Sequence, residues 1–291
     1  MEGHKKRVDV SFEFFPPNTP TLKEKMDHAI DLLAPLDPQF VSITYGADGS
    51  TRHRTHQTVA RLLETTDLQV APHLTCVDAS QGEIDDIARQ YWDLGARHLV
   101  ALRGDPPREP RLAGKNVAQY RYAADLVAGL KRVADFEISV AAYPEVHADA
   151  PSARFDLDNL KRKIDAGASR AITQFFFDAD TYLNFRDQAV ASGITAPIVP
   201  GILPINHFAK MCQFANNCGS SVPDWLHERF AGLDNDKDTR QLIAAAVAID
   251  LVETLQREGV NEFHFYTLNN AALTYAICHA LGVRPQQEAA A

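Results

Sequence analysis

Short apolar runs recur along this chain at regular intervals, and each is followed by a stretch with helical periodicity. We expect strands at residues 8–15, 40–46, 69–76, 98–104, 137–144, 170–177, 197–204 and 262–268. We expect helices at residues 22–36, 53–66, 81–95, 121–135, 154–168, 179–193, 206–217 and 269–282. The first seven strands start 27 to 39 residues apart, which suits one right-handed β-α unit each. Eight such units predict an α/β fold of the (β/α)₈ TIM-barrel type.

A doubly wound parallel sheet is the alternative fold. Such a sheet usually binds phosphate through glycines after its first strand, but here Pro16-Pro17-Asn18-Thr19 follows that strand, and neither G-x-G-x-x-G nor G-x-x-x-x-G-K-[ST] occurs. The long interval between the seventh and eighth strands has to hold extra helices, which we expect over 238–259 and 223–233. We expect residues 1–291 to form one domain, with 1–7 and 284–291 as frayed tails.

Composition excludes several classes of protein. A net charge of -9 argues against non-specific nucleic-acid binding, which needs a basic surface. The four cysteines form no C-x-x-C pair, and no apolar run is long enough for a signal peptide or a membrane span, so we expect a soluble cytoplasmic protein. No H-E-x-x-H occurs among the 11 histidines, and Cys212 and Cys218 have no partners at zinc-ligand spacing, so no metal site is predicted.

Glu13 is the carboxylate of the first predicted strand and lies among Phe12, Phe14 and Phe15. An ionised carboxylate among aromatic rings is costly to bury unless it is paired or protonated. Near the mouth of a site, such a glutamate is a candidate acid at neutral pH. The alternative is that Glu13 faces solvent or an arginine on an ordinary strand.

Polar residues also end most of the other predicted strands. They are Thr44-Tyr45-Gly46, His73-Leu74-Thr75, Arg103-Gly104-Asp105, Tyr143 to His147, Gln174, Leu203-Pro204 and Tyr266-Thr267-Leu268. Because a barrel gathers the carboxyl ends of its strands at one face, these residues predict an active site there. His73 and His147 could equally be structural histidines that bond a backbone carbonyl.

One helix carries a second signal. Asp156, Asn159, Arg162 and Lys163 share one face of the helix predicted over 154–168. This pattern is typical of a solvated polar face, but two cations and an amide could also hold the phosphate and ribose of an anionic cofactor.

Several sequence blocks resemble those of bacterial 5,10-methylenetetrahydrofolate reductases, in matching order from about Val8 to Pro285. They are S-F-E-F-F-P-P, V-S-I-T-Y-G-A, P-H-L-T-C, A-L-R-G-D-P-P, A-A-Y-P-E-V-H, N-L-K-R-K-I-D-A-G-A, I-T-Q-F-F-F-D, P-G-I-L-P and F-H-F-Y-T-L-N. The resemblance implies a short form of the family that consists of the catalytic barrel. It further implies bound FAD, NADH or NADPH as reductant, and homo-oligomers. The implied reaction converts 5,10-methylenetetrahydrofolate to 5-methyltetrahydrofolate by ping-pong hydride transfer through the flavin.

The same resemblance implies roles for individual residues. Glu13 would be the general acid that assists opening of the five-membered folate ring, and Asp105 a catalytic carboxylate that stabilises a cationic intermediate. The residues implied to bind the folate substrate are Glu13, Gln174, Phe214, Tyr266 and Leu268. The residues implied to bind FAD are Thr44, Tyr45, His73, Arg103, Gly104, Asp105, Tyr122, Ala123, Tyr143, His147, Asp156, Asn159, Arg162 and Lys163.

The chain departs from the family pattern at two places. The segment from Pro106 to Gln119 is longer than expected, and Lys210 stands where a polar amide is expected. A flavin-free pterin- or folate-binding barrel, or a methyl-transfer barrel, remains the alternative function.

Overall fold

The computed structural model describes residues 7–45, 52–105, 110–112 and 116–285. Its strands are β1 (Asp9–Phe14), β2 (Val41–Ile43), β3 (Val70–Thr75), β4 (His98–Leu102), β5 (Glu137–Ala142), β6 (Arg170–Thr173), β7 (Ile198–Val199), β8 (Gly201–Ile202) and β9 (Glu262–Tyr266). Its α-helices are α1 (Pro20–Leu33), α2 (Arg52–Thr65), α3 (Gln81–Asp93), α4 (Ala123–Val133), α5 (Ala153–Asp165), α6 (Ala179–Ala191), α7 (Phe208–Cys218), α8 (Asp224–Phe230), α9 (Lys237–Arg257) and α10 (Ala271–Ala280), and a 3₁₀ helix, η1 (Ala34–Leu36), follows α1.

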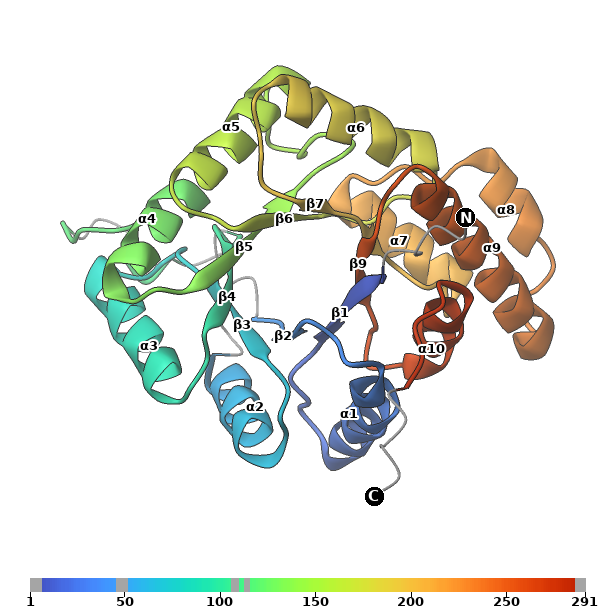
Figure 1. The fold of residues 1–291 in the computed structure, drawn as a ribbon, viewed down its shortest axis with the longest axis horizontal. Helices are drawn as coiled ribbons and strands as arrows, with labels where there is room; N and C mark the ends of the chain where they lie inside the picture. The colour runs from blue at the N-terminus through green and yellow to red at the C-terminus, as the bar shows by residue number, and fades with distance from the viewer. Residues whose placement is uncertain (1–6, 46–51, 106–109, 113–115, 286–291) are drawn as a thin grey trace, which may run out of the picture.

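The strands form a ring of parallel neighbours. The sheet order is β7-β6-β5-β4-β3-β2-β1-β9-β8, and β7 and β8 at its two ends are separated in the chain only by Pro200. Proline has no N–H to donate, which divides this segment into two short strands, while its carbonyl still accepts from the backbone N–H of His264 at 3.0 Å. The ring therefore closes through residues 198–202. Figure 1 shows β1 in blue beside β9 in red, with the helices around the strands. The predicted (β/α)₈ barrel is confirmed.

Side chains along β1 alternate between two environments. Phe12 and Phe14 are buried in the main core, where the strands pack against the surrounding helices. Ser11 and Glu13 point the other way, into the barrel, where they meet side chains of β9 and β3. The apolar side chains on the outer face of β1 thus stabilise the fold, and the polar side chains on its inner face are available to form a site.

An apolar layer fills the middle of the barrel. It consists of Phe40, Ala71, Val100, Ile172 and Val199. Two buried serine–histidine pairs accompany it: the Ser11 hydroxyl lies 2.8 Å from Nδ1 of His264, and the Ser139 hydroxyl 2.8 Å from Nε2 of His98. The interior is therefore packed rather than open, and a ligand can enter only from the rim.

The two extra helices predicted over 223–233 and 238–259 are confirmed as α8 and α9, and α7 corresponds to the helix predicted over 206–217. Most predicted strands extend beyond the observed ladder at their carboxyl ends; β6, for example, ends at Thr173 rather than at residue 177. The difference arises because the polar rim residues leave the ladder to form loops. The predicted tails lie outside the described residues except for Arg7, Arg284 and Pro285, as do Gly46 and much of the long 106–119 segment. In the part of the chain that is described, no helix has the length and apolar character needed to cross a membrane.

Candidate active site

A cavity of about 530 Å³ opens at the carboxyl ends of the strands, and we call it the central cavity. Of the residues predicted for the site, those lining it are Glu13, Thr44, Tyr45, His73, Tyr143, Gln174, Phe214, Tyr266 and Leu268. These residues come from strand ends and loops around most of the ring and from α7, so only the closed barrel brings them together.

A second cavity of about 520 Å³, the lateral cavity, lies over the adjoining strand ends and against α5. Of the predicted residues, it is lined by Tyr45, Arg103, Gly104, Asp105, Tyr122, Ala123, Tyr143, His147, Asp156, Asn159, Arg162 and Lys163. Tyr45, Leu102, Ala141 and Tyr143 line both cavities. The two therefore join into one elongated groove, and every residue to which the family resemblance assigns a role lines one part of it or both. The predicted strand-end residues Leu203, Pro204 and Thr267 do not line it.

Glu13 enters the central cavity from β1 with 15% of its side chain exposed. Its Oε2 lies 3.4 Å from Nε2 of His73 and 3.9 Å from Nε2 of His264. Burial lowers the pKa of His73 to about 4, although the neighbouring Glu13 charge acts to raise it. Among the described residues, no lysine or arginine pairs with Glu13. The carboxyl group thus faces a cavity and the imidazoles of two buried histidines, and the alternative of an ordinary arginine pair does not hold.

Asp105 lies in the lateral cavity rather than in the central one. It follows Gly104, whose φ of 84° turns the chain out of β4. Burial, together with the nearby charges of Asp156 and Asp105, raises the pKa of Tyr143 to about 12. Because Tyr143 lines both cavities, Asp105 is placed beside their junction, with Glu13 on the other side.

The wall of the central cavity is aromatic. Phe214 of α7 stacks on Phe175 with ring centroids 5.3 Å apart. The Tyr266 hydroxyl donates to the Thr173 carbonyl at 2.7 Å, which fixes the ring of Tyr266 across the barrel mouth. The backbone N–H of Phe175 donates to Oε1 of Gln174 at 3.0 Å, and this leaves the amide nitrogen of Gln174 to the cavity. Flat rings beside one amide suit a planar heterocyclic ligand.

Exposed aromatic rings concentrate at the two cavities. Phe15 and Phe214 line the central cavity, and Tyr122 and Phe155 line the lateral one, yet all four are substantially exposed. An exposed ring costs free energy in water unless a ligand covers it. The concentration of such rings around one groove therefore points to ligand binding.

The polar face of α5 is not simply solvated. Lys163 is 5% exposed, and its Nζ donates to the Ala141 carbonyl at 2.5 Å. Burial lowers the pKa of Lys163 to about 8, even though the charge of Asp156 opposes this shift. Asp156 accepts the backbone N–H of His147 at 2.9 Å, and Arg162 is exposed at the edge of the lateral cavity. A buried cation at the wall of a groove indicates an anionic ligand rather than plain hydration.

His147 also belongs to the lateral cavity. Its Nδ1 accepts the backbone N–H of Asp149 at 3.0 Å, and its ring packs edge-on against Tyr143 at 4.6 Å. The bond to Asp149 leaves Nε2 as the protonated nitrogen of the neutral ring. His73 and His147 thus both line the groove, and neither is a histidine of the closed core alone.

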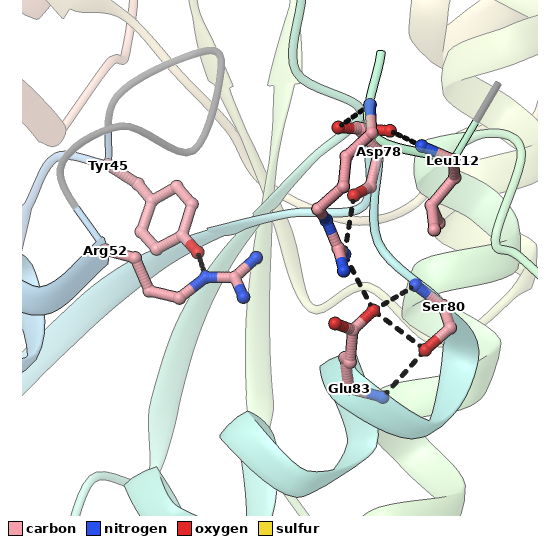
Figure 2. A network of polar contacts seen from close by, with 7 residues as sticks. Tyr45, Arg52, Asp78, Ser80, Glu83 and Leu112 are labelled. Carbon is pink, nitrogen blue, oxygen red and sulfur yellow. Dashed lines mark hydrogen bonds and ion pairs between the residues drawn. The ribbon is translucent and has the colours of Figure 1, made fainter.

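A polar network holds the described part of the long 106–119 segment against the start of α3 (Figure 2). Asp78 accepts the backbone N–H groups of Arg111 and Leu112 at 2.8 and 2.7 Å. Arg111 in turn donates to Glu83 at 2.9 Å, and this bond contributes most to lowering the pKa of Glu83 to about 2. Ser80 and Glu83 form the capping box of α3. Residues 110–112 are therefore anchored by specific contacts.

The same view shows Tyr45 with Arg52, the first residue of α2. Nε of Arg52 donates to the Tyr45 hydroxyl at 2.5 Å. This bond orients a ring that lines both cavities.

The chain is similar to known proteins over most of its length. The family model described as methylenetetrahydrofolate reductase matches residues 1–282. The chain belongs to the methylenetetrahydrofolate reductase family. The 5,10-methylenetetrahydrofolate reductase of Pectobacterium carotovorum is 57% identical over 279 residues, which cover 96% of this chain and 92% of that protein. The reductase of the same name from Escherichia coli is 54% identical with the same coverage.

Two more distant proteins are also similar to this chain. Methylenetetrahydrofolate reductase 2 of Saccharomyces cerevisiae is 33% identical over 99% of this chain and 50% of its own length. A Clostridium thermocellum protein solved with two copies of 5-methyl-5,6,7,8-tetrahydrofolic acid superposes with a TM-score of 0.63 over 95% of both chains. At 15% identity this structural likeness shows the shared fold alone.

Several residues that line the groove of this methylenetetrahydrofolate reductase family member were not predicted from the sequence. They are Phe15, Phe155, Phe175, Asp149 and His264. His264 precedes Tyr266 by two residues, so strand alternation places both side chains on the inner face. Applying this alternation to the last strand could have found His264, whereas Asp149 and Phe155 lie beyond the ladder and carry no such signal.

Proposed function

We propose that this protein catalyses the FAD-dependent reduction of 5,10-methylenetetrahydrofolate to 5-methyltetrahydrofolate, with NADH or NADPH as the reductant. Family membership supports the reductase activity. The observation that carries the proposal is the Glu13 carboxyl group, which faces a cavity lined by aromatic rings beside a neutral histidine. An acid in such a place can protonate a bound heterocycle.

The groove fits FAD. Its two joined cavities accept an elongated ligand, and the lateral one carries the cations that a pyrophosphate requires. Nζ of Lys163 is bonded to a carbonyl rather than to a carboxylate, so its charge is open to compensation by a phosphate. Arg162 would bind phosphate oxygens beside it, and Asp156 and Asn159 would bind ribose hydroxyls. When bound, FAD would supply the hydride carrier between nicotinamide and folate.

The chain's own groups would act on the folate in the central cavity. Glu13 would hold a proton and give it to the folate nitrogen that is released as the five-membered ring opens. Asp105, beside the junction of the cavities, would stabilise the positive charge that develops on the substrate. Gln174 would orient the pterin through its free amide, while Phe214, Tyr266 and Leu268 would cover its faces and exclude water.

We expect ping-pong kinetics, because one cavity would serve both nicotinamide and folate. The central cavity, of about 530 Å³, is the one that we assign to both ligands. Nicotinamide and folate would therefore occupy it in turn, and the first product would leave before the second substrate binds.

An absorbance spectrum followed by anaerobic titration tests the proposal. We expect a yellow protein that NADH or NADPH bleaches, and methylenetetrahydrofolate should then restore the colour with formation of methyltetrahydrofolate. Separate titrations with each nicotinamide identify the physiological reductant. A colourless protein that binds folate would overturn the proposal in favour of a flavin-free pterin-binding or methyl-transfer barrel.

A further inference from the structure

A second histidine approaches Glu13 from deeper in the barrel. His264 lines the central cavity at 1% exposure, and its Nε2 lies 3.9 Å from Oε2 of Glu13. Its Nδ1 lies 2.8 Å from the Ser11 hydroxyl. The strand register accounts for this arrangement: Ser11 pairs with His264 and Glu13 with Tyr266, so the imidazole lies one inward position below the carboxyl group.

The Ser11 contact determines which nitrogen of His264 carries the proton. Among the described residues, Nδ1 of His264 is the hydrogen-bond partner of the Ser11 hydroxyl, and no second acceptor for that hydroxyl is found. A buried hydroxyl hydrogen without an acceptor is unfavourable, so Ser11 donates and Nδ1 accepts. With Nδ1 as the acceptor, the ring carries its proton on Nε2, the nitrogen directed at Glu13.

Oε2 of Glu13 is the oxygen nearest to both His73 and His264. Oε1 is therefore the oxygen left for a ligand in the cavity. A general acid needs this division, because the oxygen that holds the proton must face the substrate while the other oxygen receives the developing charge.

We propose that Ser11 and His264 are positioning residues for Glu13. Ser11 holds His264 with its proton on Nε2, and His264 donates from Nε2 to Oε2 as Glu13 loses its proton from Oε1 to the folate nitrogen. No proton leaves His264 in this step, and the negative charge stays on the carboxylate. The separation of 3.9 Å closes to a hydrogen bond when that charge forms, as catalytic contacts often do only in the reacting complex. This inference rests on the proposed function.

The surroundings of His264 support a change of charge at Glu13. The titratable groups around the ring are Glu13, Tyr266, His73, His98 and Glu262. Burial lowers the pKa of His73 to about 4 and that of His98 to about 3, so both are neutral near pH 7. Glu262 is paired with Arg170 at 3.4 Å. Phe40 stacks on the ring at 5.8 Å and is apolar.

Rapid-mixing kinetics of the folate half-reaction across pH test the inference. His264→Leu removes the Nε2 donor, so we expect a rate about tenfold lower, and Ser11→Ala leaves that donor in only part of the molecules, so its rate should fall by less. Because the carboxylate is then less stable, Glu13 keeps its proton to higher pH, and the alkaline limb should move up by about one pH unit. His264→Gln retains an N–H donor, so both its rate and its alkaline limb should lie close to those of the wild type. Reduction of the flavin by nicotinamide needs no proton from Glu13, so in all three variants it should fall by much less than the folate half-reaction.

Ser139→Ala is the matched control, because Ser139 forms the same kind of buried pair with His98 but has no contact with Glu13. It should leave the pH limb in place. The inference would be overturned if the alkaline limb of the pH–rate profile stayed at its wild-type pH in both Ser11→Ala and His264→Leu. It would also be overturned if that limb shifted equally in Ser139→Ala.

A second measurement is independent of the reaction. Nitrogen-15 NMR of histidine-labelled protein should show His264 protonated on Nε2, a mixture of tautomers in Ser11→Ala, and a shifted Nε2 signal in Glu13→Gln. Protonation on Nδ1 in the wild-type protein would refute the proposed arrangement even if the enzyme is active. If no flavin reaction is found, the proposed function fails. The tautomer of His264 seen by NMR would still test the inference about Ser11 and His264. The same measurement decides it if His264→Leu does not fold.

Discussion

Asn269 binds both backbone polar groups of Phe15: its Oδ1 accepts from the N–H at 2.8 Å, and its Nδ2 donates to the carbonyl at 3.0 Å. The same loop reaches Glu13, whose carbonyl accepts the Thr267 hydroxyl at 2.6 Å. Leu268 and Asn269 have φ of 50° and 53°, a region that asparagine adopts more readily than most residues. The end of the last strand thus holds the end of the first and fixes the backbone from which Glu13 enters the cavity.

Asn269→Ala should destabilise the protein by about 2–4 kcal/mol, because two partly buried hydrogen bonds are lost and alanine is strained at positive φ. Asn269→Gly loses the same bonds without the strain, so it should cost about 1–2 kcal/mol less. Urea unfolding measures both. Losses below about 0.5 kcal/mol in both variants would show that the amide does not stabilise the rim.

The barrel itself could be predicted from sequence because each β-α unit leaves a local signal, an apolar run and then a helical stripe. Rim residues such as Gln174 could be named because they end such runs. The contact between Glu13 and His73 could not, because it joins β1 to β3 across the barrel interior and depends on how the ring closes. The burial of Lys163 was also hidden, because its helix pattern fits a solvated face equally well.

Glu13→Gln should slow the folate half-reaction by about 10²–10⁴-fold, because the amide keeps the shape of the side chain but cannot give up a proton in its place. Flavin content and reduction by nicotinamide should be unchanged. Glu24→Gln removes an equal charge from an exposed position on α1 and serves as the control. Wild-type folate turnover in Glu13→Gln would show that another group supplies the proton.

Replacing Arg162 and Lys163 together by alanine should weaken FAD binding by more than about 100-fold, because each cation would make a charge-assisted bond worth about 1.5–3 kcal/mol. The control is Arg154→Ala/Lys161→Ala on the same helix, since those cations pair with Asp158 and Asp165 and line neither cavity. Fluorescence titration of flavin into stripped protein gives both affinities. Equal FAD affinities in the two double variants would show that the Arg162 face of α5 is only a solvated surface and does not bind the cofactor.

Gly201 lies against the ring of Tyr266, and this contact forbids a larger residue. A Cβ at this position would lie 2.2 Å from the Thr173 carbonyl oxygen and 2.6 Å from Cε2 of Tyr266. Gly201→Ala should therefore cost about 3 kcal/mol and displace Tyr266 from its bond to Thr173, with weaker folate binding. Gly82→Ala in α3 meets nothing within 4 Å and should stabilise by about 0.5–1 kcal/mol. A Gly201→Ala variant as stable as the wild type would contradict this packing.

Two histidines in the barrel interior predict a loss of stability in mild acid. Burial lowers the pKa of His73 to about 4 and that of His98 to about 3. The unfolded chain, with histidine pKa values near 6.5, binds more protons than the folded chain below that pH, so the free energy of unfolding falls as pH drops from about 6.5 towards 4. Each histidine contributes up to about 1.4 kcal/mol per pH unit.

His98→Gln can keep a hydrogen bond to Ser139 but cannot titrate, so it should remove about half of this acid dependence. Urea unfolding at pH 7, 6 and 5 gives the slopes, and the interval stays above the range in which most carboxylates titrate. If this variant kept the wild-type slope, the pKa of His98 in the folded protein would have to lie near the ordinary histidine value. The barrel interior would then hold a charged imidazole against Phe40. The ring centroids of Phe40 and His98 are 4.2 Å apart, and a charge buried against an apolar ring is unfavourable.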